Sequence, residues 1–170
     1  MRITHTDFFT QDGYTLAQQL IGMYICRDIG GSIVRRQITE TECYLGSEDT
    51  ACHAHKGRTK RTEIMWAQGG VCYVYLCYGI HNMLNIISGE KDRPQGVLIR
   101  GVTGADGPGK LTKLLQIDRS FNGENLIDSR RIWLETGDSL PYMATPRIGI
   151  GYASRADQQA LWRFVAKERN

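Results

Sequence analysis

Residues 71–87 read VCYVYLCYGIHNMLNII and carry a strong β-strand pattern. Residues 71–78 are rich in aromatic and β-branched side chains, and residues 83–87 resume the pattern after a short turn. A third run of this kind covers residues 96–102. The turn at 78–82 carries large side chains, although turns are usually polar. We therefore expect neighbouring strands joined by an atypical turn.

A second pair of strands is predicted upstream. Residues 23–27 and 32–44 are strand-like and flank a glycine turn, which is typical of a β-hairpin. In the second arm, Ile38, Glu40 and Glu42 alternate with the residues between them. Both glutamates are therefore expected on one face of that strand.

The remaining predicted elements are short. Residues 12–21 show helical spacing of apolar side chains behind Asp12, which can cap the helix. The sequence GPGKL at 107–111 opens a second helix, with Pro108 where a missing amide hydrogen costs little. We also expect late strands at 131–135, 147–152 and 162–165, and a helix at 155–161 capped by Ser154.

The composition is that of an ordinary folded protein. With 170 residues, 41% hydrophobic and 23% charged, the chain can bury one core, and we expect a single domain spanning residues 1–170. No apolar run approaches the length of a membrane span, and the first residues lack the apolar core of a secretory signal, which predicts a cytoplasmic protein. The five cysteines form no C-x-x-C pair, so reduced and packed thiols are expected.

Positive charge is clustered rather than abundant. The net charge is only +3, but Lys56, Arg58, Lys60 and Arg61 lie within six residues, without an acid among them. A solvated loop explains such a run about as often as a phosphate contact does. The cluster alone does not establish nucleic-acid binding.

Six segments, in this order and spacing, resemble the alkyladenine, or 3-methyladenine, DNA glycosylase family. They are ETECYLGSEDTACH (40–53), GRTKR (57–61), VCYVYLCYGIHNMLNI (71–86), GVLIRG (96–101), GPGKL (107–111) and RIGI (147–150). Any one would be a weak signal, but six in order are specific. The resemblance implies an α+β fold, in which helices flank a curved antiparallel sheet and a β-hairpin protrudes to intercalate in DNA.

The resemblance also implies an activity. A monofunctional DNA glycosylase of base excision repair flips a damaged purine out of duplex DNA from the minor groove and hydrolyses its N-glycosidic bond, which leaves an abasic site. The substrates would be of the 3-methyladenine, 7-methylguanine, hypoxanthine and ethenoadenine class. We expect double-stranded DNA as the partner, no metal or organic cofactor, a monomer, and a location at the nucleoid of a bacterium or in the nucleus of a eukaryote.

Glu42 is the residue that the resemblance indicates as general base. Near its ordinary pKa it would be ionised at neutral pH and could take a proton from an attacking water. Arg100 matches the arginine that helps to hold the water and an adjacent phosphate, although a strand-end arginine is often only an ion-pair partner. Glu40 shares the predicted face and is the rival base. The family pattern favours the second glutamate of E-T-E, whereas spacing alone does not decide.

Further positions match residues that bind the base or the DNA in the family. Tyr44, His53 and Tyr75 correspond to rings that stack on the purine, although a strand tyrosine is more often core packing. Asn85 corresponds to the residue that excludes guanine by crowding its amino group. The wedge that fills the vacated stack corresponds to Tyr78, Ile80 and His81. The expected contacts to the DNA backbone are Arg58, Thr59, Arg61 and Lys110.

Two other hypotheses stay open at this stage. A small basic sheet domain could bind nucleic acid without cutting it, since a related fold occurs in RNA-handling proteins. Alternatively, Cys43, Cys52, His53 and His55 could bind a metal, although their spacing does not match the usual zinc pairs. The chain also departs from the family pattern at Thr62, at 68–70, in the short connection from Arg100 to Gly107, and in ending at Asn170. These departures bear on the substrate range and the backbone contacts.

Overall fold

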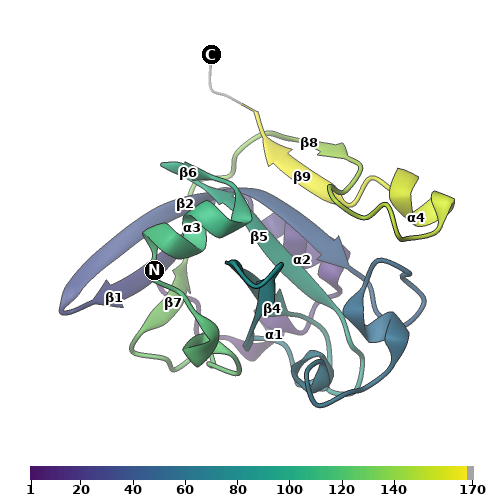
Figure 1. Cartoon of the computed structure of the whole chain (residues 1–170). Helices are drawn as coiled ribbons and strands as arrows, with labels where there is room; N and C mark the ends of the chain where they lie inside the picture. Colours follow the sequence, from purple (N-terminus) through teal and green to yellow (C-terminus); the bar gives the residue numbers. More distant parts are fainter. Residues whose placement is uncertain (168–170) are drawn as a thin grey trace.

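A curled antiparallel sheet dominates the computed structural model, which describes residues 1–167 (Figure 1). Its main path runs in the order β3-β4-β5-β2-β1-β7; in addition, β6 pairs with β5, β9 with β2, and β8 with β9. The strands of the described residues are β1 Tyr24–Ile29, β2 Ser32–Tyr44, β3 Cys72–Cys77, β4 His81–Ile87, β5 Gly96–Val102, β6 Ala105–Asp106, β7 Ile132–Glu135, β8 Tyr142–Thr145 and β9 Arg163–Ala166.

The helices are short and lie around this sheet (Figure 1). The α-helices are α1 Thr6–Phe9, α2 Gly13–Gln19, α3 Pro108–Leu114 and α4 Arg155–Gln159, and the 3-10 helices are η1 His53–Lys56, η2 Glu63–Trp66 and η3 Arg119–Phe121. An antiparallel sheet that curls, accompanied by few helices, confirms the predicted α+β class.

The long strand β2 connects the two parts of the sheet. Along one edge of β2, residues 32–37 pair with β1 and residues 40–42 pair with β9. On the other edge, residues 38–44 pair with β5, and the register shifts on both sides of Glu40. Such a bulge moves later side chains to the other face. Strict alternation would put Ile38 on the face of the two glutamates, which is wrong: Ile38 packs in the main core with Cys43. Glu40 and Glu42 do share a face, and both contact Arg100.

Strands β3 and β4 form a hairpin whose tip projects large side chains. The pairing runs from Cys72 opposite Ile86 to Cys77 opposite His81, so the second strand starts two residues earlier than predicted. Between the strands, Tyr78 is 91% exposed and Ile80 is 73% exposed. Tyr78 also has a φ of 51°, which is rare for a bulky residue and suggests a functional position. The expectation of an atypical apolar turn is confirmed.

The helix predictions follow from local capping and hold in the structure. The Asp12 carboxylate accepts a hydrogen bond from the Thr15 amide at the start of α2, and Ser154 caps α4 in the same way through the Asp157 amide. Helix α3 starts at Pro108 and buries Leu111 and Leu115 in the core. The described cysteines are all free thiols, and four of the five are buried, as expected.

One predicted strand is absent. Residues 147–152 form a loop, although strands are present at 132–135 and 163–166 as expected. The alternation of apolar residues with glycine in this segment imitates a strand. The backbone amide of Ile148 instead donates to the Glu42 carboxylate, and Gly149 has a φ of 74°. The segment therefore does not have the extended backbone that pairing as a β-strand requires.

Candidate active site

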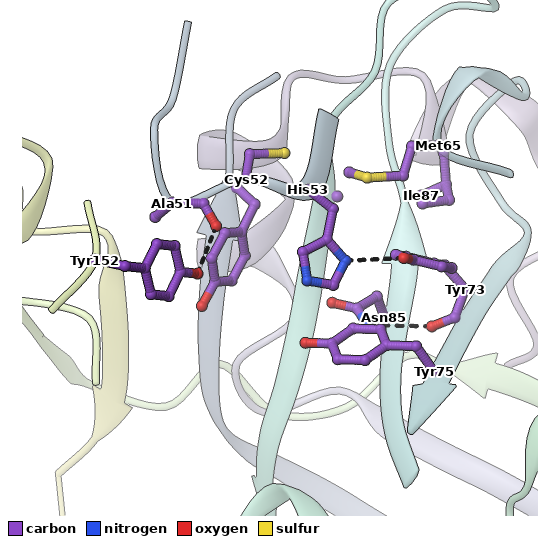
Figure 2. Close-up of a pocket in the computed structure, with 11 residues that line it drawn as sticks. Ala51, Cys52, His53, Met65, Tyr73, Tyr75, Asn85, Ile87 and Tyr152 are labelled. Carbon is purple, nitrogen blue, oxygen red and sulfur yellow. Dashed lines mark hydrogen bonds between the residues drawn. The ribbon is translucent and has the colours of Figure 1, made fainter. Parts of the chain in front are cut away.

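An aromatic pocket opens beside the β3–β4 hairpin (Figure 2). Counted out to its open mouth, its volume is about 380 Å³. Strands β3 and β4 direct alternate residues to this side of the sheet, which is why Tyr73 and Tyr75 lie beside Asn85 and Ile87. The lining residues are Tyr44, Ala51, Cys52, His53, Met65, Tyr73, Tyr75, Asn85, Ile87, Gly96 and Tyr152. All four predicted base-binding residues are therefore in one pocket.

His53 is fixed in the pocket by two tyrosines of β3. Its Nδ1 atom lies 2.8 Å from the Tyr73 hydroxyl, and its ring centroid is 4.6 Å from that of Tyr75 (Figure 2). Burial, together with the charges of Arg61 and Lys56, lowers the pKa of His53 below its usual value. Both effects favour the neutral form of the ring.

Tyr73 was missed by the sequence analysis. Its spacing of two residues from Tyr75 on a predicted strand was the signal that both rings face the same way. Besides bonding His53, Tyr73 accepts a hydrogen bond at its backbone oxygen from the Asn85 Nδ2 atom at 3.1 Å. That bond fixes the Asn85 amide in the pocket wall, where Figure 2 shows it close to Tyr75.

Glu42 lies behind the pocket wall and is completely buried. Its Oε1 atom accepts a hydrogen bond from the Tyr44 hydroxyl at 2.9 Å, and its Oε2 atom accepts one from the Ile148 amide at 2.7 Å. Burial raises the pKa of Glu42, while Arg100 and these two donors lower it. The expectation of an ordinary pKa was wrong, because no sequence pattern reveals that the side chain is removed from water.

Arg100 connects the two glutamates. Its Nε atom donates to Glu40 at 2.9 Å, and its Nη1 atom lies 3.7 Å from Glu42 Oε1. Glu40 Oε1 is also bound by Arg163 Nε at 2.6 Å. Glu40 is thus held between two guanidinium groups, whereas Glu42 bonds a residue that lines the pocket. The two glutamates, which spacing alone does not distinguish, therefore have different surroundings.

The loop at 146–153 completes the site, and its contribution was also missed. Besides the Ile148 amide, it brings the guanidinium group of Arg147 to 4.8 Å from the Tyr44 ring centroid. The Tyr152 hydroxyl donates to the Ala51 carbonyl at 2.9 Å and forms the side of the pocket opposite His53 and Tyr75 (Figure 2). The only sequence signal was the RIGI motif at 147–150.

The predicted DNA-contacting residues lie on exposed surface but differ in their surroundings. Arg58 is in ion pairs with Glu63 at 3.4 Å and with Asp92 at 3.6 Å, and Lys110 is in one with Asp106 at 3.3 Å. Exposed pairs of this kind contribute little and can be exchanged for phosphates at low cost. The Thr59 hydroxyl lies 3.1 Å from that of Thr62, so the threonine that departs from the family pattern stabilises this loop.

Residues 1–167 contain neither a cluster of metal-binding side chains nor a membrane-spanning helix. Within them, histidine, cysteine, aspartate and glutamate side chains are nowhere grouped in threes at a geometry that could hold a metal ion. His55, one of the candidate ligands, has its Nδ1 atom 2.7 Å from the Ser47 carbonyl. No helix in this part of the chain has the length and apolarity needed to span a bilayer.

Comparison with known proteins identifies the family of this chain. The profile of the family described as methylpurine-DNA glycosylase matches residues 7–106 and 103–170. A protein of Borreliella burgdorferi strain ZS7, provisionally named a 3-methyladenine DNA glycosylase, is 41% identical over 95% of this chain and 94% of its own length. A protein of the same provisional name from Psychrobacter cryohalolentis is 40% identical over 96% of this chain and 91% of its own length. The chain belongs to the methylpurine-DNA glycosylase family and is a DNA glycosylase.

Proposed function

We propose that the protein excises damaged purines from duplex DNA by flipping them into the aromatic pocket and hydrolysing the N-glycosidic bond with a water that Glu42 activates. The proposed substrates are alkylated or deaminated purines of the 3-methyladenine, 7-methylguanine, hypoxanthine and ethenoadenine class. The observation that carries the proposal is the 2.9 Å hydrogen bond from Tyr44 to Glu42, because it places a carboxylate directly behind a wall of a pocket lined with rings.

The pocket supports selectivity for flat, electron-poor bases. Rings from Tyr44, His53 and Tyr75 line it, and stacking on an aromatic side chain is worth about 1–3 kcal/mol per base. A damaged base pairs weakly, so its extrusion costs less than that of a normal base. Asn85 is the residue that we propose to exclude guanine, since its amide is fixed by the bond to Tyr73 and cannot move away from a 2-amino group.

In the proposed reaction Glu42 is the general base. The water oxygen bonds to the sugar C1′ atom while the bond from C1′ to the purine nitrogen breaks. The purine leaves with the bonding electron pair, and Glu42 takes the proton of the water. The ionised carboxylate also stabilises the positive charge that develops on the sugar. Because Glu42 is fully buried, the water must enter with the nucleotide, at the Oε1 atom that the Tyr44 hydroxyl otherwise holds.

The surface around the pocket supports binding to duplex DNA. We propose that Tyr78, Ile80 and His81 enter the minor groove and that Tyr78 fills the gap left by the flipped base. Basic residues on both sides of the hairpin, Arg58, Arg61 and Lys110, would contact the phosphates, with Thr59 supporting the loop that carries two of them. The protein would act as a monomer, because a flipped nucleotide needs only this one pocket.

A panel of lesions tests the proposal. Duplexes that contain hypoxanthine, ethenoadenine, 7-methylguanine or 3-methyladenine are incubated with the protein and then treated with alkali, which breaks the strand at abasic sites. We expect cleavage at one or more lesions and none in the undamaged duplex. We also expect that borohydride traps no covalent complex, because water is the attacking group. A protein that binds every duplex and cleaves none would reject the proposed reaction.

A further inference from the structure

A buried ion pair lies next to the pocket but has no part in the reaction described above. Arg147 is 5% exposed, and its Nη1 and Nη2 atoms bind the two carboxylate oxygens of Asp49 at 2.7 and 2.9 Å. Its Nη1 atom also donates to the Cys43 carbonyl at 3.0 Å. A buried pair loses much hydration and is often no more stabilising than apolar residues of the same size. Its position at this site points to a role other than stability.

On one side, the pair organises the segment that leads to His53. Asp49 Oδ2 accepts a hydrogen bond from the Leu45 amide at 2.9 Å, and Oδ1 accepts one from the Ala51 amide at 3.1 Å. Ala51 lines the pocket, and His53 follows two residues later. The carboxylate that binds Arg147 therefore also fixes the backbone of one pocket wall.

On the other side, the pair organises Tyr44 and Glu42. The Arg147 guanidinium group contacts two rings, with its carbon 4.8 Å from the centroid of Tyr44 and 4.8 Å from that of Trp162. The next residue along the chain, Ile148, donates its amide to Glu42. Arg147 therefore determines where a hydrogen-bond donor to Glu42 lies, and it contacts the ring whose hydroxyl is the other donor.

We propose that Arg147, anchored by Asp49, is a positioning residue for base excision. It holds the wall at Tyr44, the wall at His53 and the carboxylate of Glu42 in one fixed arrangement, without touching the substrate. The inference rests on the proposed function, because it assumes that Glu42 activates the water. Geometric precision of this kind matters greatly: displacement of a reacting group by 1 Å can lower a rate about 100-fold.

The test is single-turnover excision of hypoxanthine from a duplex by Arg147→Met, Arg147→Lys and Asp49→Asn. We expect each to lower the maximal rate about 10- to 100-fold while the affinity for the duplex stays unchanged. In Arg147→Met the acid limb of the pH–rate profile should also move to higher pH, because the Arg147 charge lowers the pKa of Glu42. Arg147→Lys keeps that charge and should keep the limb near its original pH, while its rate stays low.

A control variant separates this effect from the loss of an arginine ion pair elsewhere in the sheet. Arg35 is in an ion pair with Glu135 at 2.7 Å, in the part of the sheet where β2 is paired with β1. Arg35→Met should change neither the rate nor the pH profile. Arg147→Lys keeps a cation that can face the buried Asp49 carboxylate, so it provides a folded variant if Arg147→Met or Asp49→Asn does not fold. Unchanged rates and profiles in folded Arg147 and Asp49 variants of an active enzyme would overturn the inference, whereas a wild-type protein that excises nothing would instead reject the proposed function.

Discussion

Replacement of Tyr78 by alanine should separate the excision of paired lesions from that of unpaired ones. Because Tyr78 is 91% exposed, its side chain makes almost no contacts that stabilise the fold, and the free energy of unfolding should change by less than about 0.5 kcal/mol. In the proposed complex the ring stacks in the duplex, an interaction worth about 1–3 kcal/mol. Its loss should lower the excision rate in duplex DNA about 5- to 150-fold. Excision of the same lesion from a single strand should not change, because no base stack has to be filled.

The assay is single-turnover excision of hypoxanthine from a duplex and from the unpaired strand. Tyr78→Phe is the conservative variant, and it should retain most of the duplex activity because it keeps the ring. Ile33→Ala is the matched control: Ile33 is a 61% exposed apolar residue near the tip of the other hairpin, between β1 and β2. Equal losses on both substrates in Tyr78→Ala, or no loss on the duplex, would refute the wedge.

Three further predictions concern the pocket and the DNA surface. Burial raises the pKa of Glu42 above the usual 4.5 of glutamate, so the excision rate should increase as the pH rises through that higher pKa. A carboxyl group whose pKa is raised in the folded state makes the protein less stable as the pH rises. Glu42→Gln should therefore increase Tm more at pH 8 than at pH 4, and an equal gain at both would contradict this. Asn85→Ala should increase excision of normal guanine and leave that of hypoxanthine, which lacks the 2-amino group, largely unchanged; a parallel increase would count against exclusion by clash. Lys110→Ala should reduce the slope of log Kd against log salt by about 0.9, the amount expected for one phosphate contact, and an unaltered slope would remove Lys110 from the interface.

Local patterns were sufficient to predict most elements of the fold. The aromatic and β-branched runs became β3, β4 and β5, and Asp12, Pro108 and Ser154 mark helix starts because each acts on its own first turn. The predictions that failed depended on partners far away in the sequence. Ile38 points into the core because of a bulge opposite β5, and residues 147–152 form a loop because an amide there binds Glu42.

The candidate site was likewise predictable in part. The resemblance identified Tyr44, His53, Tyr75 and Asn85, and the structure brings all four into one pocket. Their roles in binding a purine remain proposals. The sequence could not show that Glu42 is desolvated, since burial is a property of the assembled sheet and loops. It also gave no sign that Arg147 pairs with a residue 98 positions away.

Two variants test which carboxylate activates the water. Glu42→Gln and Glu40→Gln should both be measured for affinity and for single-turnover excision on one lesion duplex. We expect Glu42→Gln to bind like the parent and to lose about 100- to 10,000-fold in rate, the usual contribution of a general base. Glu40→Gln should remain active, because the Glu40 carboxylate is already engaged in ion pairs with Arg100 and Arg163 and is not the proposed base. Retained excision in Glu42→Gln, with Glu40→Gln inactive, would contradict the proposed mechanism.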